Sequence, residues 1–141
     1  QRDWKSLVEA IRNGPPRVSP MRLTFLDRLT NTVEFFVHLE DVRRAQPNWQ
    51  PRTLLDDLES QLRTSITQGG RLFARKSPCG LVLQIAHGAS VVAKKGEPAV
   101  TVTGEVGELI MFVYGRQDHA RVELSGPDDL VQAVRSTAFG V

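Results

Sequence analysis

The feature that most constrains the fold of this chain is a change in hydrophobic spacing near Gly69-Gly70. Before this point apolar residues recur every three to four positions, which is typical of amphipathic helices. After it they fall into short strand-like runs separated by turn residues, at 72–76, 81–86, 90–95 and 99–103. Helices followed by a series of strands predict an α+β protein.

Three helices are expected in the first half of the chain. Apolar residues at helical spacing predict helices over 3–13, 24–45 and 53–67, with prolines between them. A proline-bracketed linker follows the second helix. We therefore expect residues 1–52 to belong to one unit and residues 53–141 to form another.

The second unit is expected to be a small α+β domain. Its strand-like runs are joined by short turns, so they predict a meander and a mostly antiparallel sheet. The apolar segment 105–114 predicts a buried helix that ends at Gly115. A strand over 119–125 and a last helix over 127–138 are expected to follow.

The helix predicted over 24–45 carries a polar stripe. Glu34 and His38 lie one turn apart on one face, and Asn31 and Asp41 continue that face at three-residue steps. Apolar residues flank the stripe on both sides, so we expect the stripe to be buried and the remaining wedge to be exposed. The flanks are Leu26, Val33 and Val37 on one side and Phe35, Leu39 and Val42 on the other, and the wedge carries Arg28, Thr32 and Arg43.

The Glu34–His38 pair has two chemical interpretations. Side chains spaced i, i+4 can reach one metal ion from the same helix face, and a metal would offset the lost hydration of a buried carboxylate and imidazole. A hydrogen bond or an ordinary surface pair would explain the same spacing. A catalytic zinc takes about three protein ligands and a water, so a third ligand would have to come from elsewhere.

Two parts of the sequence resemble one known family. Residues 31–38 read Asn-Thr-Val-Glu-Phe-Phe-Val-His and precede Glu-Asp-Val-Arg-Arg-Ala at 40–45. Together they resemble the metal-binding helix of the mycothiol-dependent maleylpyruvate isomerase family. Residues 109–116, Leu-Ile-Met-Phe-Val-Tyr-Gly-Arg, and residues 120–126 are similar to the end of the second domain of that family. The resemblance covers nearly the whole chain.

The resemblance implies a fold. Members of the family join a DinB-like four-helix bundle to a small α+β domain similar to sterol carrier proteins. Residues 1–52 would then be the C-terminal part of the bundle and residues 53–141 the sterol-carrier-like domain. The family carries a first histidine ligand on a helix well upstream of the Glu-x-x-x-His helix. This chain shows no counterpart, so we expect an upstream bundle segment to be missing from it.

The resemblance also implies a chemistry. A metal-activated low-molecular-weight thiol, mycothiol, would act on a small anionic electrophile in an isomerase or thiol-transfer reaction. Glu34 and His38 would bind a divalent metal, with zinc the first choice. Asn31 and Asp41 would line the cofactor pocket, and Arg116 would be the catalytic residue that holds the substrate anion. The most similar members are metal-binding proteins of unassigned reaction, so whether this chain is an enzyme stays open.

Other interpretations remain at this point. Arg116 follows a predicted helix end, where a cation interacts favourably with the last carbonyl groups, so it would need no ligand. The second unit would be a non-catalytic carrier or interaction module if Leu81, Leu83, Ile85 and the helix over 109–113 lined an apolar cavity. The chain would act as a regulatory protein if it were a degenerate family member without metal.

Charge, hydrophobicity and cysteine content indicate which partners and which cellular compartment to expect. The net charge of +2 comes from scattered residues, whereas nucleic-acid binding needs a clustered basic patch. No apolar run approaches the length of a membrane span, so we expect no membrane partner. A single cysteine, Cys79, excludes an internal disulfide and favours a cytoplasmic location. The oligomeric state is not predicted.

Overall fold

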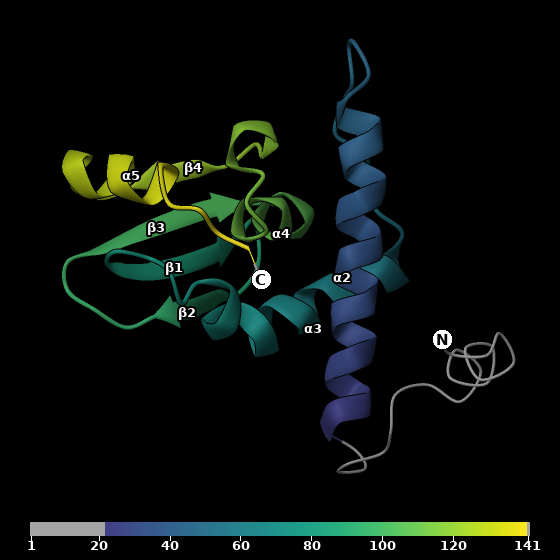
Figure 1. Ribbon diagram of the computed structural model, residues 1–141, viewed down its shortest axis with the longest axis horizontal. Coiled ribbons are helices and arrows are strands. Elements are labelled where there is room, and N and C mark those ends of the chain that lie inside the picture. Colours follow the sequence, from purple (N-terminus) through teal and green to yellow (C-terminus); the bar gives the residue numbers. More distant parts are fainter. Residues whose placement is uncertain (1–21, 141) are drawn as a thin grey trace, which may run out of the picture.

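The computed structural model describes residues 22–140, and the helix predicted over 3–13 lies outside this range. The motif segment forms α2 (Arg22–Arg44), which confirms the predicted helix within two residues. This long helix stands beside an α+β unit, as Figure 1 shows. α3 (Asp56–Phe73) contacts α2 and continues to the sheet, where it packs against β2.

The sheet is mixed, in the strand order β2-β1-β3-β4. Its strands are β1 (Gly80–Ile85), β2 (Ser90–Lys94), β3 (Ala99–Gly104) and β4 (Glu123–Ser125). β1 pairs antiparallel with β2 and parallel with β3, and β3 pairs antiparallel with β4. The α+β class and the largely antiparallel pairing are therefore confirmed, but the predicted meander is wrong.

The position of β3 follows from what it buries. Val100 and Val102 on β3 are fully buried, as are Leu81 and Leu83 on β1. These two strands occupy the centre of the sheet, whereas β2, which buries only Ala93, forms an edge. The chain therefore crosses from β2 past β1 to pair β3 on the far side, because that order places the most apolar strands under the helices.

The strand predicted over 72–76 is wrong, since α3 continues through the glycine pair to Phe73. Gly70 is buried against β2, and a Cβ at this position would lie 3.3 Å from the Val91 side chain. The glycine therefore permits close approach of helix and sheet and does not end the helix here. The strand predicted over 119–125 is reduced to β4, because a 3-10 turn, η1 (Gln117–His119), precedes it.

The second unit is built around α4 (Val106–Val113), in which every residue is buried. The helix ends as predicted at Gly115, whose φ of 83° closes it with paired backbone bonds from Gly115 N to Phe112 O and from Arg116 N to Met111 O. This Schellman arrangement satisfies the last carbonyl groups of the helix. α5 (Asp128–Arg135) packs against β3 and completes the domain.

The core joins the first unit to the second. Val33, Phe36 and Val37 of α2 belong to the same buried cluster as the sheet and α4. Close contact is possible because a Cβ on Gly107 would lie 3.0 Å from the Phe36 ring. Leu81, Leu83 and Ile85 are packed into this core with α4. None of the helices in residues 22–140 is long and apolar enough to cross a membrane.

Candidate functional site

The two sides of α2 differ from the sequence prediction. Glu34, His38 and Asn31 are exposed, so the expected burial of the polar stripe is wrong. The buried side is instead the row of Val33, Phe36, Val37, Glu40 and Arg44. The physical reason is that only one of the two apolar flanks is covered by α3 and α4. The other flank faces outward, with Phe35 73% and Val42 63% exposed.

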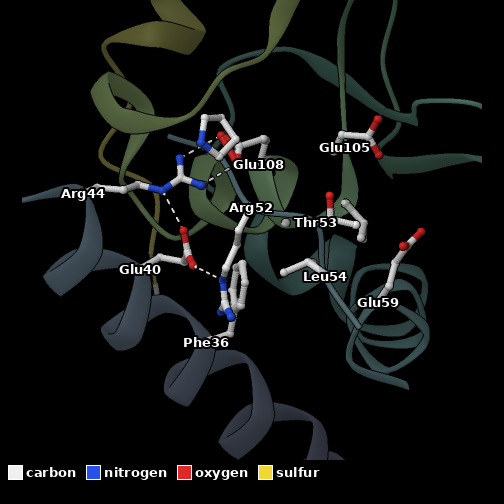
Figure 2. A pocket seen from close by; sticks show the side chains of 12 residues that line it. Phe36, Glu40, Arg44, Arg52, Thr53, Leu54, Glu59, Glu105 and Glu108 are labelled. Atoms are coloured by element: carbon white, nitrogen blue, oxygen red, sulfur yellow. Dashed lines mark hydrogen bonds and ion pairs between the residues drawn. The ribbon is translucent and has the colours of Figure 1, made fainter. Parts of the chain in front are cut away.

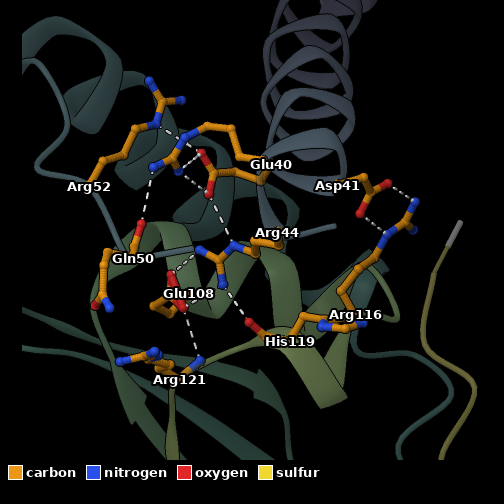
Figure 3. Close-up of polar contacts among 10 residues, drawn as sticks. Glu40, Asp41, Arg44, Gln50, Arg52, Glu108, Arg116, His119 and Arg121 are labelled. Carbon is orange, nitrogen blue, oxygen red and sulfur yellow. Dashed lines mark hydrogen bonds and ion pairs between the residues drawn. The ribbon is translucent and has the colours of Figure 1, made fainter. Parts of the chain in front are cut away.

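Asp41 nevertheless joins the motif face to the second unit. Its carboxylate accepts two hydrogen bonds from Arg116, from Nε at 3.1 Å and from Nη2 at 2.7 Å. Figure 3 shows this paired contact, with Arg116 approaching α2 from the turn after α4. The Schellman turn at Gly115 directs the arginine toward α2, and its Nη1 donates to the Tyr114 carbonyl at 2.6 Å. The two side chains remain about one-third exposed.

The Asp41 contact raises the pKa of Arg116 above its ordinary value, so the guanidinium stays charged. Nε and both Nη atoms already donate hydrogen bonds. Each Nη carries two N–H groups, so one donor on each remains for a further acceptor. Arg116 is thus held in place by Asp41 and still has donors that could contact an anion.

Glu34 lies close enough to the end of α4 to act on Tyr114. Burial raises the pKa of the Tyr114 phenol, and the negative charge of Glu34 raises it further. The Tyr114 ring packs edge-on to Phe73, with 5.2 Å between ring centroids. Glu34, His38 and Asp41 therefore follow one another along the edge of α2 that borders the second unit.

The described residues do not assemble a metal site of three or more ligands. Glu34 and His38 remain one turn apart, but residues 22–140 contain no group of three or more His, Cys, Asp or Glu side chains placed to hold a metal. The other histidines are elsewhere: His87 occupies the turn between β1 and β2 with φ of 55°, and His119 ends η1 and does not begin the strand predicted over 119–125. Cys79 is partly buried beside the start of β1.

On the buried side, Glu40 forms a charge cluster that the sequence analysis missed. Its side chain is only 1% exposed and accepts hydrogen bonds from three arginines. Arg43 and Arg52 donate at 2.9 and 2.8 Å, and Arg44 Nε donates at 3.0 Å. Burial alone would raise the pKa of Glu40, but the bonds from Arg44, Arg52 and Arg43 outweigh it and hold this pKa below 4.5.

Arg44 connects this cluster to α4. Its two Nη atoms bond both carboxylate oxygens of Glu108, whose Oε1 lies 2.7 Å from Arg44 Nη1 and also accepts the Arg121 backbone N–H. The Arg44 guanidinium also lies 4.5 Å from the centre of the Trp49 ring, and Figure 3 shows the surrounding contacts. Glu108 sits in an otherwise apolar buried helix, so this contact supplies the partner that its charge needs.

A signal for the cluster was present in the sequence. Phe36, Glu40 and Arg44 are spaced by four residues and are in phase with Val33 and Val37. The apolar members of that row would have placed Glu40 on the buried side. Nothing local to α2 identifies Glu108, which is 64 residues from Arg44.

Searches for similar proteins found no match to this chain among protein-family models, curated proteins or solved structures.

Proposed function

We propose that this chain forms part of a metal-dependent thiol site of the isomerase or thiol-transfer type. Glu34 and His38 would bind a divalent metal, with zinc the first choice, and the thiol would be a small cofactor such as mycothiol. The substrate would be a small anionic electrophile, held by Arg116. This proposal rests on the resemblance of residues 31–45 and 109–126 to the isomerase family.

The Asp41–Arg116 ion pair is the observation that carries the proposal. It brings a charged arginine of the second unit to the helix edge that also carries Glu34 and His38. The partners are 75 residues apart in sequence, so the juxtaposition is a product of the fold. Two metal-ligating side chains beside an anion-binding group form the arrangement that thiol addition to an anionic substrate needs.

The donor set fits a divalent metal in part. Imidazole and carboxylate together suit zinc and neighbouring first-row metals. Both side chains are exposed and free to turn toward an ion. Two ligands fall short of the three that a catalytic zinc usually takes, and residues 22–140 place no third His, Cys, Asp or Glu with them in a metal-binding group.

The chemistry of the site divides between the metal and the protein. A divalent metal bound there would lower the pKa of a coordinated thiol, so that it is deprotonated near neutral pH. Arg116 would hold the substrate carboxylate through its remaining N–H groups. Asp41 would fix the direction of the Arg116 guanidinium, because it occupies two of its nitrogens. Asn31, which is exposed one turn before Glu34, would line the cofactor side of the site.

Metal binding is tested by adding Co²⁺ to the isolated chain and following backbone NMR signals. We expect weak binding, because the described residues supply two ligands, with paramagnetic broadening centred on residues 34–38. The His38→Ala variant should weaken this binding by roughly tenfold or more. His87→Asn is the matched control, since it removes an exposed imidazole while keeping a residue type that tolerates positive φ. Broadening that is unchanged by His38→Ala would contradict the proposed ligands.

The catalytic part is tested with zinc, mycothiol and maleylpyruvate as probe reagents. Arg116→Ala should lower kcat/KM by about a hundredfold or more if Arg116 holds the substrate anion. Arg116→Lys keeps the positive charge but loses the planar fork, so it should also lose activity. Activity that is equal in all three proteins would remove Arg116 from the site. Metal binding without any thiol-dependent reaction would favour the degenerate, regulatory interpretation.

A further inference from the structure

A cavity of about 370 Å³ lies on the buried side of α2, between that helix, the linker before α3 and the start of α4. Its volume falls in the range of about 300 to 1,000 Å³ that small-molecule sites occupy. Apolar side chains line part of it, and charged side chains, with Thr53 and Gly107, line the rest; the apolar ones are Phe36, Pro51, Leu54 and Val106. Glu34 and His38 are not among the lining residues, so this cavity is separate from the proposed thiol site.

One wall of the cavity carries an arginine with unused hydrogen-bond donors. Arg44 and Arg52 line this wall beside Glu40 and Glu108, so its lining charges balance. Arg52 lines the cavity and is 32% exposed. Within the described residues only its Nε donates a hydrogen bond, to Glu40. Both Nη groups of Arg52 therefore remain as donors for a ligand.

The other wall carries a carboxylate. Glu105 lines the cavity just before α4, and its side chain makes no capping hydrogen bond to that helix. The neighbouring Glu59 is neutralised by Arg63 at 2.7 Å, whereas Glu105 forms no ion pair within residues 22–140. Figure 2 shows Arg52 beside Phe36 and Glu40, with Glu105 and Glu59 on the other side of Leu54. Unused donors and an unused acceptor thus lie on different walls of one cavity.

We propose that this cavity binds a small zwitterion of the α-amino acid type. The ligand carboxylate would accept hydrogen bonds from Arg52, and its ammonium group would donate to Glu105. An apolar ligand side chain would lie against Leu54 and Phe36. A purely anionic ligand would meet the Glu105 carboxylate, and a purely cationic one would meet Arg52, so each would match only one wall.

Three related compounds test the charge pattern. L-Leucine carries both groups, 4-methylpentanoate lacks the ammonium group, and 3-methylbutylamine lacks the carboxylate. Chemical-shift titration of the whole chain should show leucine binding at least about tenfold more tightly than either analogue, since each analogue loses one charge-assisted contact. Equal affinity for leucine and one analogue, or no saturable binding of leucine, would overturn the proposal.

Variants of the lining residues test whether leucine binds in this cavity. Glu105→Gln and Arg52→Gln should each lower leucine affinity by about tenfold or more. Glu105 is exposed and makes no side-chain cap, so its variant should stay folded and keep the test valid if Arg52→Gln does not. Leu54→Trp should block the cavity. Leu55→Trp is the matched control, because Leu55 is 80% exposed and does not line the cavity. Leucine binding that survives Leu54→Trp unchanged would place the site elsewhere and overturn the proposal.

Discussion

The two sides of α2 carry the same kinds of charged residue in opposite environments. On the buried side Glu40 is almost fully enclosed and bonded to three arginines. On the other side Glu34 and His38 are exposed, and the nearest ion pair, Asp41–Arg116, is one-third exposed. The buried cluster holds the helix to the second unit, whereas the exposed edge keeps its groups accessible.

The difference separates charged residues that stabilise the fold from charged residues to which the proposed function assigns binding. A buried ion pair that loses one partner leaves a charge without solvation, which is expensive. An exposed pair that loses one partner regains water at little cost. Substitutions on the buried side should therefore lower the free energy of unfolding, and substitutions on the exposed edge should leave it nearly unchanged.

The largest effect is expected at Glu40. Glu40→Ala leaves Arg44 with a single carboxylate partner and Arg43 and Arg52 with none in the cluster, and it should lower the free energy of unfolding by about 3 to 5 kcal/mol. Urea denaturation followed by circular dichroism measures this change. Glu34→Ala, on the exposed edge, is the control and should stay within about 0.5 kcal/mol of the parent. Equal losses of unfolding free energy in the two variants would contradict the difference proposed between the two sides of α2.

The second effect is on acid stability. The folded-state pKa of Glu40 is lowered, so its ionised form is favoured by folding. Its stabilising contribution is fully present above the ordinary value of 4.5 and is lost as pH falls through the lower folded value. The unfolding free energy of Glu40→Gln should therefore fall less steeply below pH 4.5 than that of the parent. Unfolding free energies that fall equally steeply with pH in the two proteins would contradict this assignment.

A smaller effect is expected for the Asp41–Arg116 pair. A double-mutant cycle with Asp41→Ala and Arg116→Ala should give a coupling free energy of roughly 0.5 to 1 kcal/mol, because the pair is bidentate but partly hydrated. Thermal or urea unfolding of the four proteins provides the measurement. A coupling as large as that around Glu40 would show that Arg116 is chiefly structural and would weaken its proposed role toward substrate.

The smallest effect is spectroscopic. Tyr114 is the only tyrosine, so ultraviolet titration of tyrosinate reports this residue alone. Its midpoint should lie above 10.0 in the folded protein, because burial and the charge of Glu34 both raise the pKa. Glu34→Gln should lower the midpoint while leaving the fold intact. Glu123→Gln, on β4, is the control and should leave the midpoint unchanged. A midpoint unaffected by Glu34→Gln would remove Glu34 from the edge that borders Tyr114.

Much of the fold could be predicted from local patterns. The bounds of α2 and α4, the glycine that ends α4 and the turn at His87 all follow from spacing and backbone preference. The extension of α3 through Gly69-Gly70 could not, because the close packing of Gly70 on β2 offsets the low helix propensity of glycine. The pairing of β3 with β1 could not be predicted either, since the residues of a turn do not specify beside which strand the next strand pairs.

The candidate site likewise has features that follow from the sequence and features that depend on tertiary packing. The sequence by itself determined that Glu34, His38 and Asp41 lie on one helix face, because that relation depends only on helical periodicity. Only the tertiary structure decided which face is buried, since that depends on where α3 and α4 dock. It also decided that Asp41 meets Arg116 and that Arg44 meets Glu108, across 75 and 64 residues of chain. Periodicity is a property of one segment, whereas burial and ion pairing belong to the packing of several.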